Sequence, residues 1–187
     1  MNNPHELSGD SDIYSDYWLH SGEYTFTGVR TEPTICLVYS GELVVECDGE
    51  TISAGKGDCL FLKGGLTTNM KQKNVGHDKF CGIFIEFDHS FLMEFYHNRR
   101  IRKYSNTKCI PYNMMKLQNK PCIRSLYVSM IPFLESGEKP PTYLLELKRM
   151  EAVFSLLNMN KNIYPCLFDM NDTSLMTLLN KNNICKN

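Results

Sequence analysis

The feature that most constrains the fold is a change in the spacing of apolar residues near residue 87. Before it, from about residue 14, short apolar runs rich in β-branched and aromatic residues alternate with turn-forming residues. Asp48-Gly49 between two such runs is a strong hairpin signal, because both residues tolerate a positive φ. Many short, closely spaced strands predict a β-sandwich or barrel. The expected strands cover residues 17–19, 24–26, 35–39, 43–47, 51–52, 59–62, 67–71 and 80–87.

After residue 87 the apolar residues recur every three or four positions, which is the spacing of helices. We expect a short helix over 89–96, a second over about 123–134 that Pro132 weakens or ends, and a third over 142–158. The tail is weakly patterned, apart from a short helix that Asp172 or Thr173 caps. The predicted organisation is a β domain over 1–88, a helical region over 89–162 and a linker over 163–187.

The third helix carries two apolar stripes on nearly opposite sides. We expect the broader stripe to pack on the domain's own core. We expect the narrower stripe to meet the same helix of a second subunit, which makes the protein a homodimer through helix 142–158. The alternative is that both stripes are buried among the chain's own elements. The broader stripe is Tyr143, Leu147, Met150, Val153, Phe154 and Leu157, and the predicted subunit contacts are Leu145, Arg149, Ala152 and Leu156.

Composition excludes several classes of protein. The net charge of −1 argues against binding of nucleic acid by these residues alone, because such domains usually carry a large positive surplus. The first six residues are polar, unlike an export signal, and the apolar runs are far shorter than a membrane span. None of the eight cysteines forms a C-x-x-C pair, so we expect reduced thiols in a cytoplasmic protein.

Catalytic and metal-binding patterns are missing from the sequence. None of the five histidines lies between Val29 and Asn74, where the central hairpins are expected. The pair His77-Asp78 lies in a polar stretch typical of a solvated turn, and no nucleotide-binding glycine motif is present. The basic cluster at 99–103 follows the first helix, where cations offset the helix dipole. We therefore expect no catalytic residue, no metal and no cofactor.

Two segments resemble a known family. The run from Gly41 to Leu62, with its Gly-Glu-Leu strand and its Gly57-Asp58 before a buried strand, resembles the central hairpins of the cupin sensor in AraC-type transcription regulators. The stretch 144–157 is similar to the helix that precedes the linker in those regulators, especially in activators of virulence and type III secretion genes. The resemblance implies a fold that is mainly β plus α, a cupin-like barrel or jelly roll followed by an antiparallel helical dimerisation region.

The resemblance also implies a function. It implies a regulatory domain that receives a small-molecule effector or a protein anti-activator and controls a C-terminal DNA-binding segment, which these 187 residues do not contain. We expect either that this segment was separated at the linker or that the gene encodes a stand-alone sensor. DNA would be bound only through that segment, and the domain itself would not be an enzyme.

An effector pocket in such a barrel would be lined by alternate residues of the strands. Solvent-facing side chains on an antiparallel sheet are the other interpretation of the same alternation. A module with a filled barrel, on whose helices a protein partner docks, is a further possibility. So is a stand-alone, metal-free cupin enzyme or binding protein for a small, sugar-like ligand. The predicted effector-binding residues are Arg30, Tyr39, Lys63, Thr67, Asn69 and Lys71.

Overall fold

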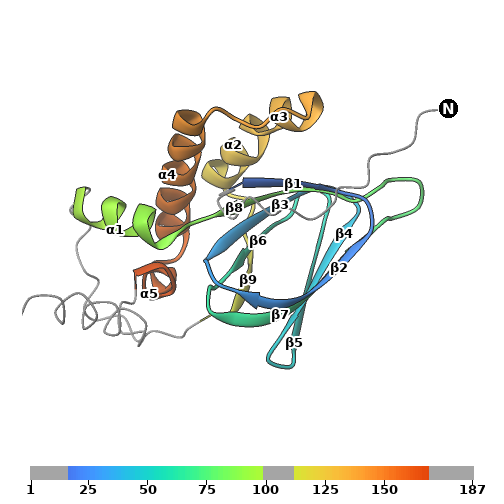
Figure 1. Ribbon diagram of the computed structural model, residues 1–187, viewed down its shortest axis with the longest axis horizontal. Helices are drawn as coiled ribbons and strands as arrows, with labels where there is room; N and C mark the ends of the chain where they lie inside the picture. Colours follow the sequence, from blue (N-terminus) through green and yellow to red (C-terminus); the bar gives the residue numbers. More distant parts are fainter. Residues whose placement is uncertain (1–16, 99–111, 169–187) are drawn as a thin grey trace, which may run out of the picture.

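The computed structural model describes residues 17–98 and 112–168 and shows two antiparallel β-sheets with a layer of helices on one side (Figure 1). One sheet has the strand order β1-β8-β3-β6-β9 and the other the order β2-β7-β4-β5, so they stack as a sandwich rather than close into a barrel. The strands are β1 (Tyr17–Ser21), β2 (Tyr24–Arg30), β3 (Thr34–Ser40), β4 (Glu42–Cys47), β5 (Glu50–Gly55), β6 (Cys59–Leu62), β7 (Leu66–Lys73), β8 (Cys81–Glu86) and β9 (Met114–Leu117).

The four-stranded sheet has one face in the core and one in solvent, which explains the alternation in its sequence. On β4, Leu43, Val45 and Cys47 are buried between the sheets, and the residues between them are half-buried. On β7 the inward residues are Thr68, Met70 and Gln72. The interior that they help to form is mostly apolar.

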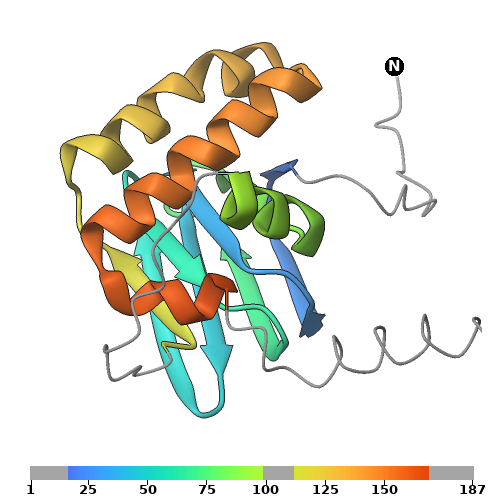
Figure 2. The ribbon, with the colours of Figure 1, turned by 90° about the vertical axis from the view of Figure 1, so that its left-hand side faces the viewer.

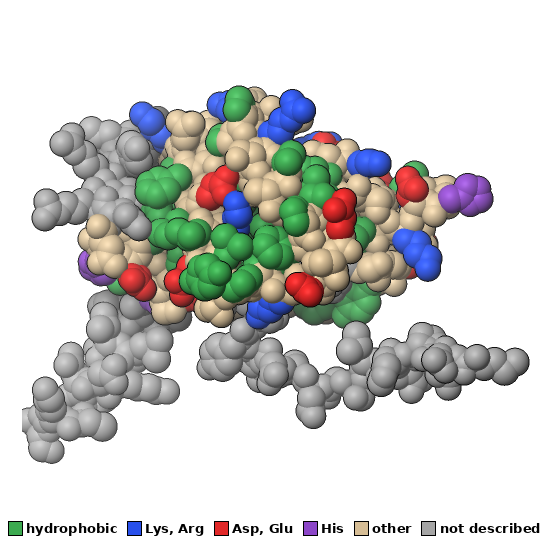
Figure 3. Space-filling view, turned by 90° about the horizontal axis from the view of Figure 1, so that it is seen from above, with side chains coloured by type: hydrophobic (Ala, Val, Ile, Leu, Met, Phe, Trp, Pro, Cys, Tyr) green, Lys and Arg blue, Asp and Glu red, His purple; other side chains and the backbone are tan. Residues whose placement is uncertain are grey.

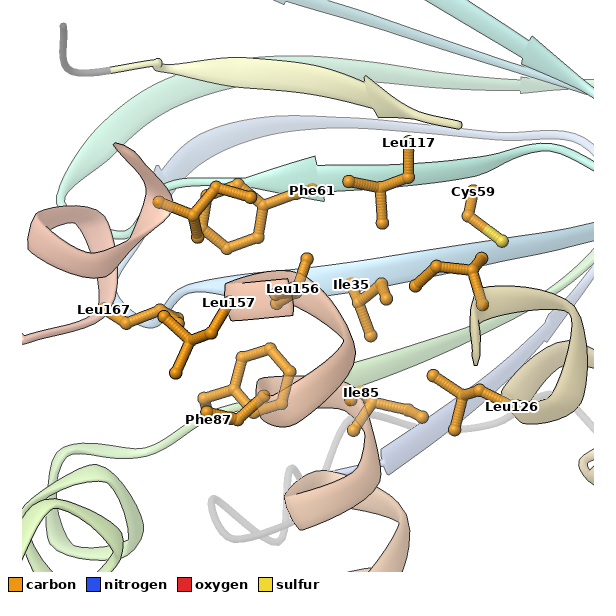
Figure 4. Packing of buried hydrophobic residues seen from close by; sticks show 14 of the residues in the cluster. Ile35, Cys59, Phe61, Ile85, Phe87, Leu117, Leu126, Leu156, Leu157 and Leu167 are labelled. Atoms are coloured by element: carbon orange, nitrogen blue, oxygen red, sulfur yellow. The ribbon is translucent and has the colours of Figure 1, made fainter. Parts of the chain in front are cut away.

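The five-stranded sheet is covered on both faces. Alternate residues of β3 face the other sheet, among them Cys36 and Val38. The residues between them, Ile35 and Leu37, belong to a separate cluster with the helices, which Figure 4 shows from close by. Double coverage makes β3, β6 and β8 nearly continuous apolar runs in the sequence.

Two glycines fix the turns of the predicted hairpins. Asp48 and Gly49 have φ values of 49° and 81°, which confirms the tight turn between β4 and β5. Gly41, with φ 71°, joins β3 to β4, and a Cβ there would lie 2.5 Å from the carbonyl oxygen of Lys73. Only glycine satisfies both the positive φ and this close approach.

The helices follow the predicted pattern closely. They are α1 (His89–Asn98), α2 (Pro121–Ser129), α3 (Ile131–Ser136), α4 (Thr142–Met159), the short 3-10 turn η1 (Lys161–Ile163) and α5 (Tyr164–Phe168). The predicted second helix is divided at Met130, and Pro132 lies in the first turn of α3. Figure 2 shows α2 and α3 running beside α4.

Two of the predicted boundaries differ from the structure. β9 lies inside the predicted helical region and adds an edge strand by pairing with β6. The predicted linker over 163–187 begins too early, because Leu167 and Phe168 of α5 are buried against the helical layer. The helix expected near Asp172 and the basic cluster at 99–103 lie outside the described residues.

Candidate functional site

Helix α4 packs on the five-stranded sheet through the narrower of its two apolar stripes. Leu145, Ala152 and Leu156 are buried inside this single chain, in the cluster that contains the helix-facing residues of β3. The expectation that these residues meet a second subunit was therefore wrong. Ser155, on the same side of the helix, is buried as well.

The broader stripe is divided between core and surface. Val153 and Leu157 are buried in the core cluster, as expected, and the rest of the stripe lies nearer the surface. Tyr143 is 69% exposed, Leu147 53% and Phe154 50%, and Met150 between them is partly buried. Their spacing of 4, 3 and 4 residues is that of the contact seam of a coiled coil. Seen from above, apolar side chains gather on the helical side of the molecule, with charged groups among them (Figure 3). We call Tyr143, Leu147, Met150 and Phe154 the α4 seam.

Arg149 is a buried charge on the inward side of α4, only 4% exposed. Its Nε donates a hydrogen bond of 2.8 Å to the backbone carbonyl of Glu86, and its Nη2 lies 3.0 Å from Oδ2 of Asp88. The guanidinium also stacks over the ring of Phe91, 5.2 Å from its centroid. Arg149, predicted as a subunit contact, instead anchors α4 to the junction between β8 and α1.

Asp88 is the second charged group of this junction. Burial raises the pKa of its carboxyl, but hydrogen bonds from Ser90 and from the N–H of Phe91, together with the charge of Arg149, outweigh burial and lower it. The pKa of Glu32, a carboxyl close to Asp88, is shifted in the opposite direction. Burial and the negative charge of Asp88 raise the pKa of Glu32.

The same junction reaches into the sandwich through Glu86. Arg30, at the end of β2, is buried and donates from Nη1 to Oε1 of Glu86 at 2.7 Å and to Oγ1 of Thr34 at 2.9 Å. Glu86 thus binds Arg30 through its carboxylate and Arg149 through its carbonyl oxygen. This connection links the sandwich interior to helix α4.

Of the predicted effector contacts, Arg30 is the charged residue inside the sandwich. Tyr39 faces the helices, where its ring stacks on Tyr127 of α2 at 4.3 Å between centroids. Its hydroxyl donates to the carbonyl of Tyr127 at 2.7 Å, and the Tyr127 hydroxyl donates to the carbonyl of Val38 at 3.2 Å. Tyr39 therefore fixes α2 to the sheet.

The other four predicted contacts lie away from the interior. Thr67, Asn69 and Lys71 are on the outer face of β7, because the inward positions are those between them. Asn69 and Lys71 bind the Glu46 carboxylate at 2.9 Å and 3.0 Å, and the bond from Lys71 lowers the pKa of Glu46. Lys63 lies in the turn between β6 and β7, so it is not on β7 with the other three residues. Effector binding by these residues stays a prediction.

Two hollows lie on the described surface. One, of about 300 Å³, is shallow and lies at the tip of the β4–β5 hairpin, with Thr67 and Asn69 in its wall. The other, of about 380 Å³, lies between α1 and α4 and is lined from α1 by Phe91, Glu94 and Phe95 and from α4 by Glu146 and Arg149. Sequence reasoning missed the second hollow, because its two walls come from segments about 50 residues apart.

The described part of the chain has neither a metal-binding cluster nor a helix that could span a membrane. Among residues 17–98 and 112–168, no three His, Cys, Asp or Glu side chains form a group that could hold a metal ion. No helix within the same ranges has the length and apolar character needed to cross a bilayer.

The fold and the helical layer define a class of protein, a cupin-like β-sandwich with a helical appendage. The chain is similar in structure to ToxT from Vibrio cholerae O395 bound to (E)-4-(8-methylnaphthalen-1-yl)but-3-enoic acid, with a TM-score of 0.56 and 11% identity over 92% of this chain and 68% of that chain. It is also similar to unsaturated fatty acid bound ToxT from strain SCE256, with a TM-score of 0.53 and 10% identity over 91% and 65% of the two chains. These identities establish the fold alone.

A putative ethanolamine utilization protein, EutQ from Salmonella typhimurium, matches a smaller region. The match has 21% identity and a TM-score of 0.33, and it covers 39% of this chain and 58% of the EutQ chain. No curated protein sequence matches the chain.

The particular family is shown by a family model. The model of the ExsA N-terminal regulatory domain matches residues 33–164, which is most of the chain. The chain belongs to this family, and it is a regulatory domain of an AraC-type transcription regulator. The expected family and the expected cupin-like fold with helices are confirmed.

Proposed function

We propose that this domain is the sensor and dimerisation unit of its regulator, and that two copies associate through the α4 seam. The observation that carries the proposal is the exposure of Tyr143, Leu147 and Phe154 at coiled-coil spacing on one helix. Val128 on the neighbouring α2 is also half exposed. Several exposed apolar side chains on one helix face are typical of protein–protein contacts.

A two-fold arrangement suits this surface. In a symmetric dimer the same patch appears on both copies, so one stripe on one helix is sufficient to form the contact. Leu147 would lie near the centre of the interface, and Tyr143 and Phe154 would lie toward its ends. The function of such a dimer is to hold two DNA-binding segments of the full regulator at a fixed spacing. Such a regulator would act in the cytoplasm.

The signal is the second part of the proposal. Arg30 is a buried cation inside a mostly apolar sandwich, and ToxT structures hold an unsaturated fatty acid or a butenoic acid derivative. An apolar carboxylic acid that entered the interior would compete with Glu86 for Arg30. Because Glu86 also binds Arg149, that exchange would reach α4. The effector would thereby alter the position of the α4 seam.

The dimerisation proposal is tested by a fusion. The domain is joined to a DNA-binding domain that represses a reporter gene only as a dimer. We expect the wild-type fusion to repress and Leu147→Glu to lose repression, while Glu138→Lys, a charge change at an exposed position outside the seam, represses like the wild type. Repression that Leu147→Glu leaves unchanged would exclude the α4 seam as the contact.

The effector proposal is tested by binding. Oleic acid should raise the unfolding temperature of the domain more than oleyl alcohol does, because only the acid can pair with Arg30. In the double variant Arg30→Met/Glu86→Gln, which removes both charges together, the difference should vanish. An equal effect of acid and alcohol on the wild type would contradict the role of Arg30.

A further inference from the structure

The cleft between α1 and α4 is lined by one face of each helix. From α1 it receives Phe91, Glu94 and Phe95, and from α4 it receives Glu146 and Arg149. Asp88, at the start of α1, lies at its inner end and is paired with Arg149. The volume of about 380 Å³ is within the range of small-molecule sites. This cleft is separate from the sandwich interior. It borders the α4 seam, because Met150 also lines it and Phe95 packs on Phe154, but the binding inferred below does not require the dimer or the effector proposed above.

The charges of the described residues around the cleft do not balance. Among the residues that the structure describes, its lining has three carboxylates, Asp88, Glu94 and Glu146, and one cation, Arg149. Arg149 is 4% exposed and is already engaged by Asp88, by the carbonyl of Glu86 and by the Phe91 ring. Within the described residues, no ion pair involves Glu94 or Glu146, and the former accepts a hydrogen bond only from the neutral amide of Asn98. The opening of the cleft therefore carries two negative charges on opposite walls.

The walls below these carboxylates are aromatic. Phe91 and Phe95 have ring centroids 5.9 Å apart, and Phe95 packs against Phe154 of α4 at 5.0 Å. Aromatic faces attract cations, and the stacking of Arg149 on Phe91 is an example inside the same cleft. A ligand with a positive end and an aliphatic body would be matched by both features of the cleft.

We propose that this cleft binds an organic cation, namely an aliphatic amine or guanidinium. Glu94 and Glu146 hold its charged groups from opposite sides, and its carbon chain lies against Phe91 and Phe95. An anionic ligand is disfavoured by the same carboxylates. A bare metal ion is disfavoured because the cleft lacks a third free carboxylate, consistent with the lack of any metal-binding group among the described residues.

The probe for the test is spermidine, whose ammonium groups are separated by short aliphatic chains. Binding is measured by isothermal titration calorimetry at low ionic strength, because screening weakens exposed charge pairs. We expect saturable binding of one spermidine per chain. In Glu94→Gln/Glu146→Gln the dissociation constant should rise by roughly tenfold or more, since two charge contacts are removed.

The matched control is Glu135→Gln/Glu138→Gln, which removes two exposed carboxylates from α3 and the segment after it. This variant has the same net charge as the cleft variant and should bind spermidine like the wild type. Circular dichroism of both variants establishes that they are folded. Equal weakening in the two variants, equal displacement by magnesium at matched ionic strength, or no saturable binding at all would overturn the proposal.

A further titration identifies the source of the cation. A lysine-containing peptide is compared with the same peptide acetylated on its ε-amine. If only the free lysine peptide binds, and binds more tightly than spermidine, the cleft takes a basic side chain of a protein. If spermidine binds more tightly, it takes a free amine. Leu147→Glu, which is expected to disrupt the dimer, should still bind spermidine or the lysine peptide in the cleft. Failure of the proposed dimer can therefore be told apart from failure of the proposed cation site.

Discussion

Replacing Arg149 tests whether this residue anchors α4 or forms a subunit contact. Arg149→Met keeps the aliphatic length of the side chain and removes the guanidinium. The hydrogen bond to the Glu86 carbonyl at 2.8 Å, the ion pair with Asp88 at 3.0 Å and the stacking on Phe91 are all lost. The carbonyl bond is worth about 1–2 kcal/mol, the partly exposed ion pair about 0.5–1 kcal/mol and the stacking about 0.5–1 kcal/mol.

We therefore expect Arg149→Met to lower the free energy of unfolding by about 2–4 kcal/mol. Arg149→Lys keeps the charge without the Nε geometry and should lose about half as much. The assay is urea unfolding followed by far-UV circular dichroism over a range of protein concentrations. If Arg149 acts within one chain, the loss of stability will be the same at every protein concentration. If it forms a subunit contact, the loss will change with protein concentration.

Two further results are expected from the same experiment. Arg124→Met, an arginine exposed on α2, should change stability by less than about 0.5 kcal/mol. Because the pKa of Asp88 is lowered by folding, the part of the loss that comes from its ion pair is present above the unfolded pKa, and it disappears as the pH falls through the folded value. A loss below about 0.5 kcal/mol in Arg149→Met, or a weaker dimer with unchanged stability, would refute the anchoring role.

The remaining predictions concern other parts of the chain. Gly41→Ala should destabilise by more than about 2 kcal/mol, whereas Gly49→Ala, also at positive φ but with open space around it, should cost about 1 kcal/mol in urea unfolding. Glu32→Gln should raise the unfolding temperature at neutral pH and have no effect below the unfolded pKa, because folding raises the pKa of Glu32 and so disfavours its charged form; a lowered temperature at neutral pH would contradict this. Burial raises the pKa of both Cys36 and Cys59 to about 12, so neither should be alkylated by iodoacetamide in the folded protein, as peptide mass spectrometry can determine.

The strand pattern was predictable from sequence because local rules determine it. Alternation, β-branched content and turns such as Asp48-Gly49 located all eight of the first strands. β9 was not predicted, because Met114–Leu117 is a strand only through its pairing with β6, more than 50 residues earlier in the chain. On β7 the predicted two-residue alternation between inward and outward side chains is present. The sequence alone did not decide that Thr67 and Lys71 face outward rather than inward.

The candidate site was less predictable for a related reason. Helix α4 is apolar on both sides, so its pattern does not indicate which side faces the core. The side that faces the core is the one with Leu145, Ala152 and Leu156, and the anchor that holds it there, the hydrogen bond from Arg149 to the Glu86 carbonyl, is a contact between distant parts of the chain. The links from Arg30 and Arg149 to Glu86 join residues 56 and 63 positions apart, and no local pattern encodes them.

The most direct test of the proposed dimer is sedimentation equilibrium of the domain and two leucine variants. We expect the wild type to be a dimer and Leu147→Glu to be a folded monomer with unchanged circular dichroism. Leu145→Glu, which places a charge in the buried cluster under α4, should instead unfold the domain. A wild-type monomer at high concentration, or a dimer that Leu147→Glu leaves intact, would contradict the assignment of the α4 seam as the contact between subunits.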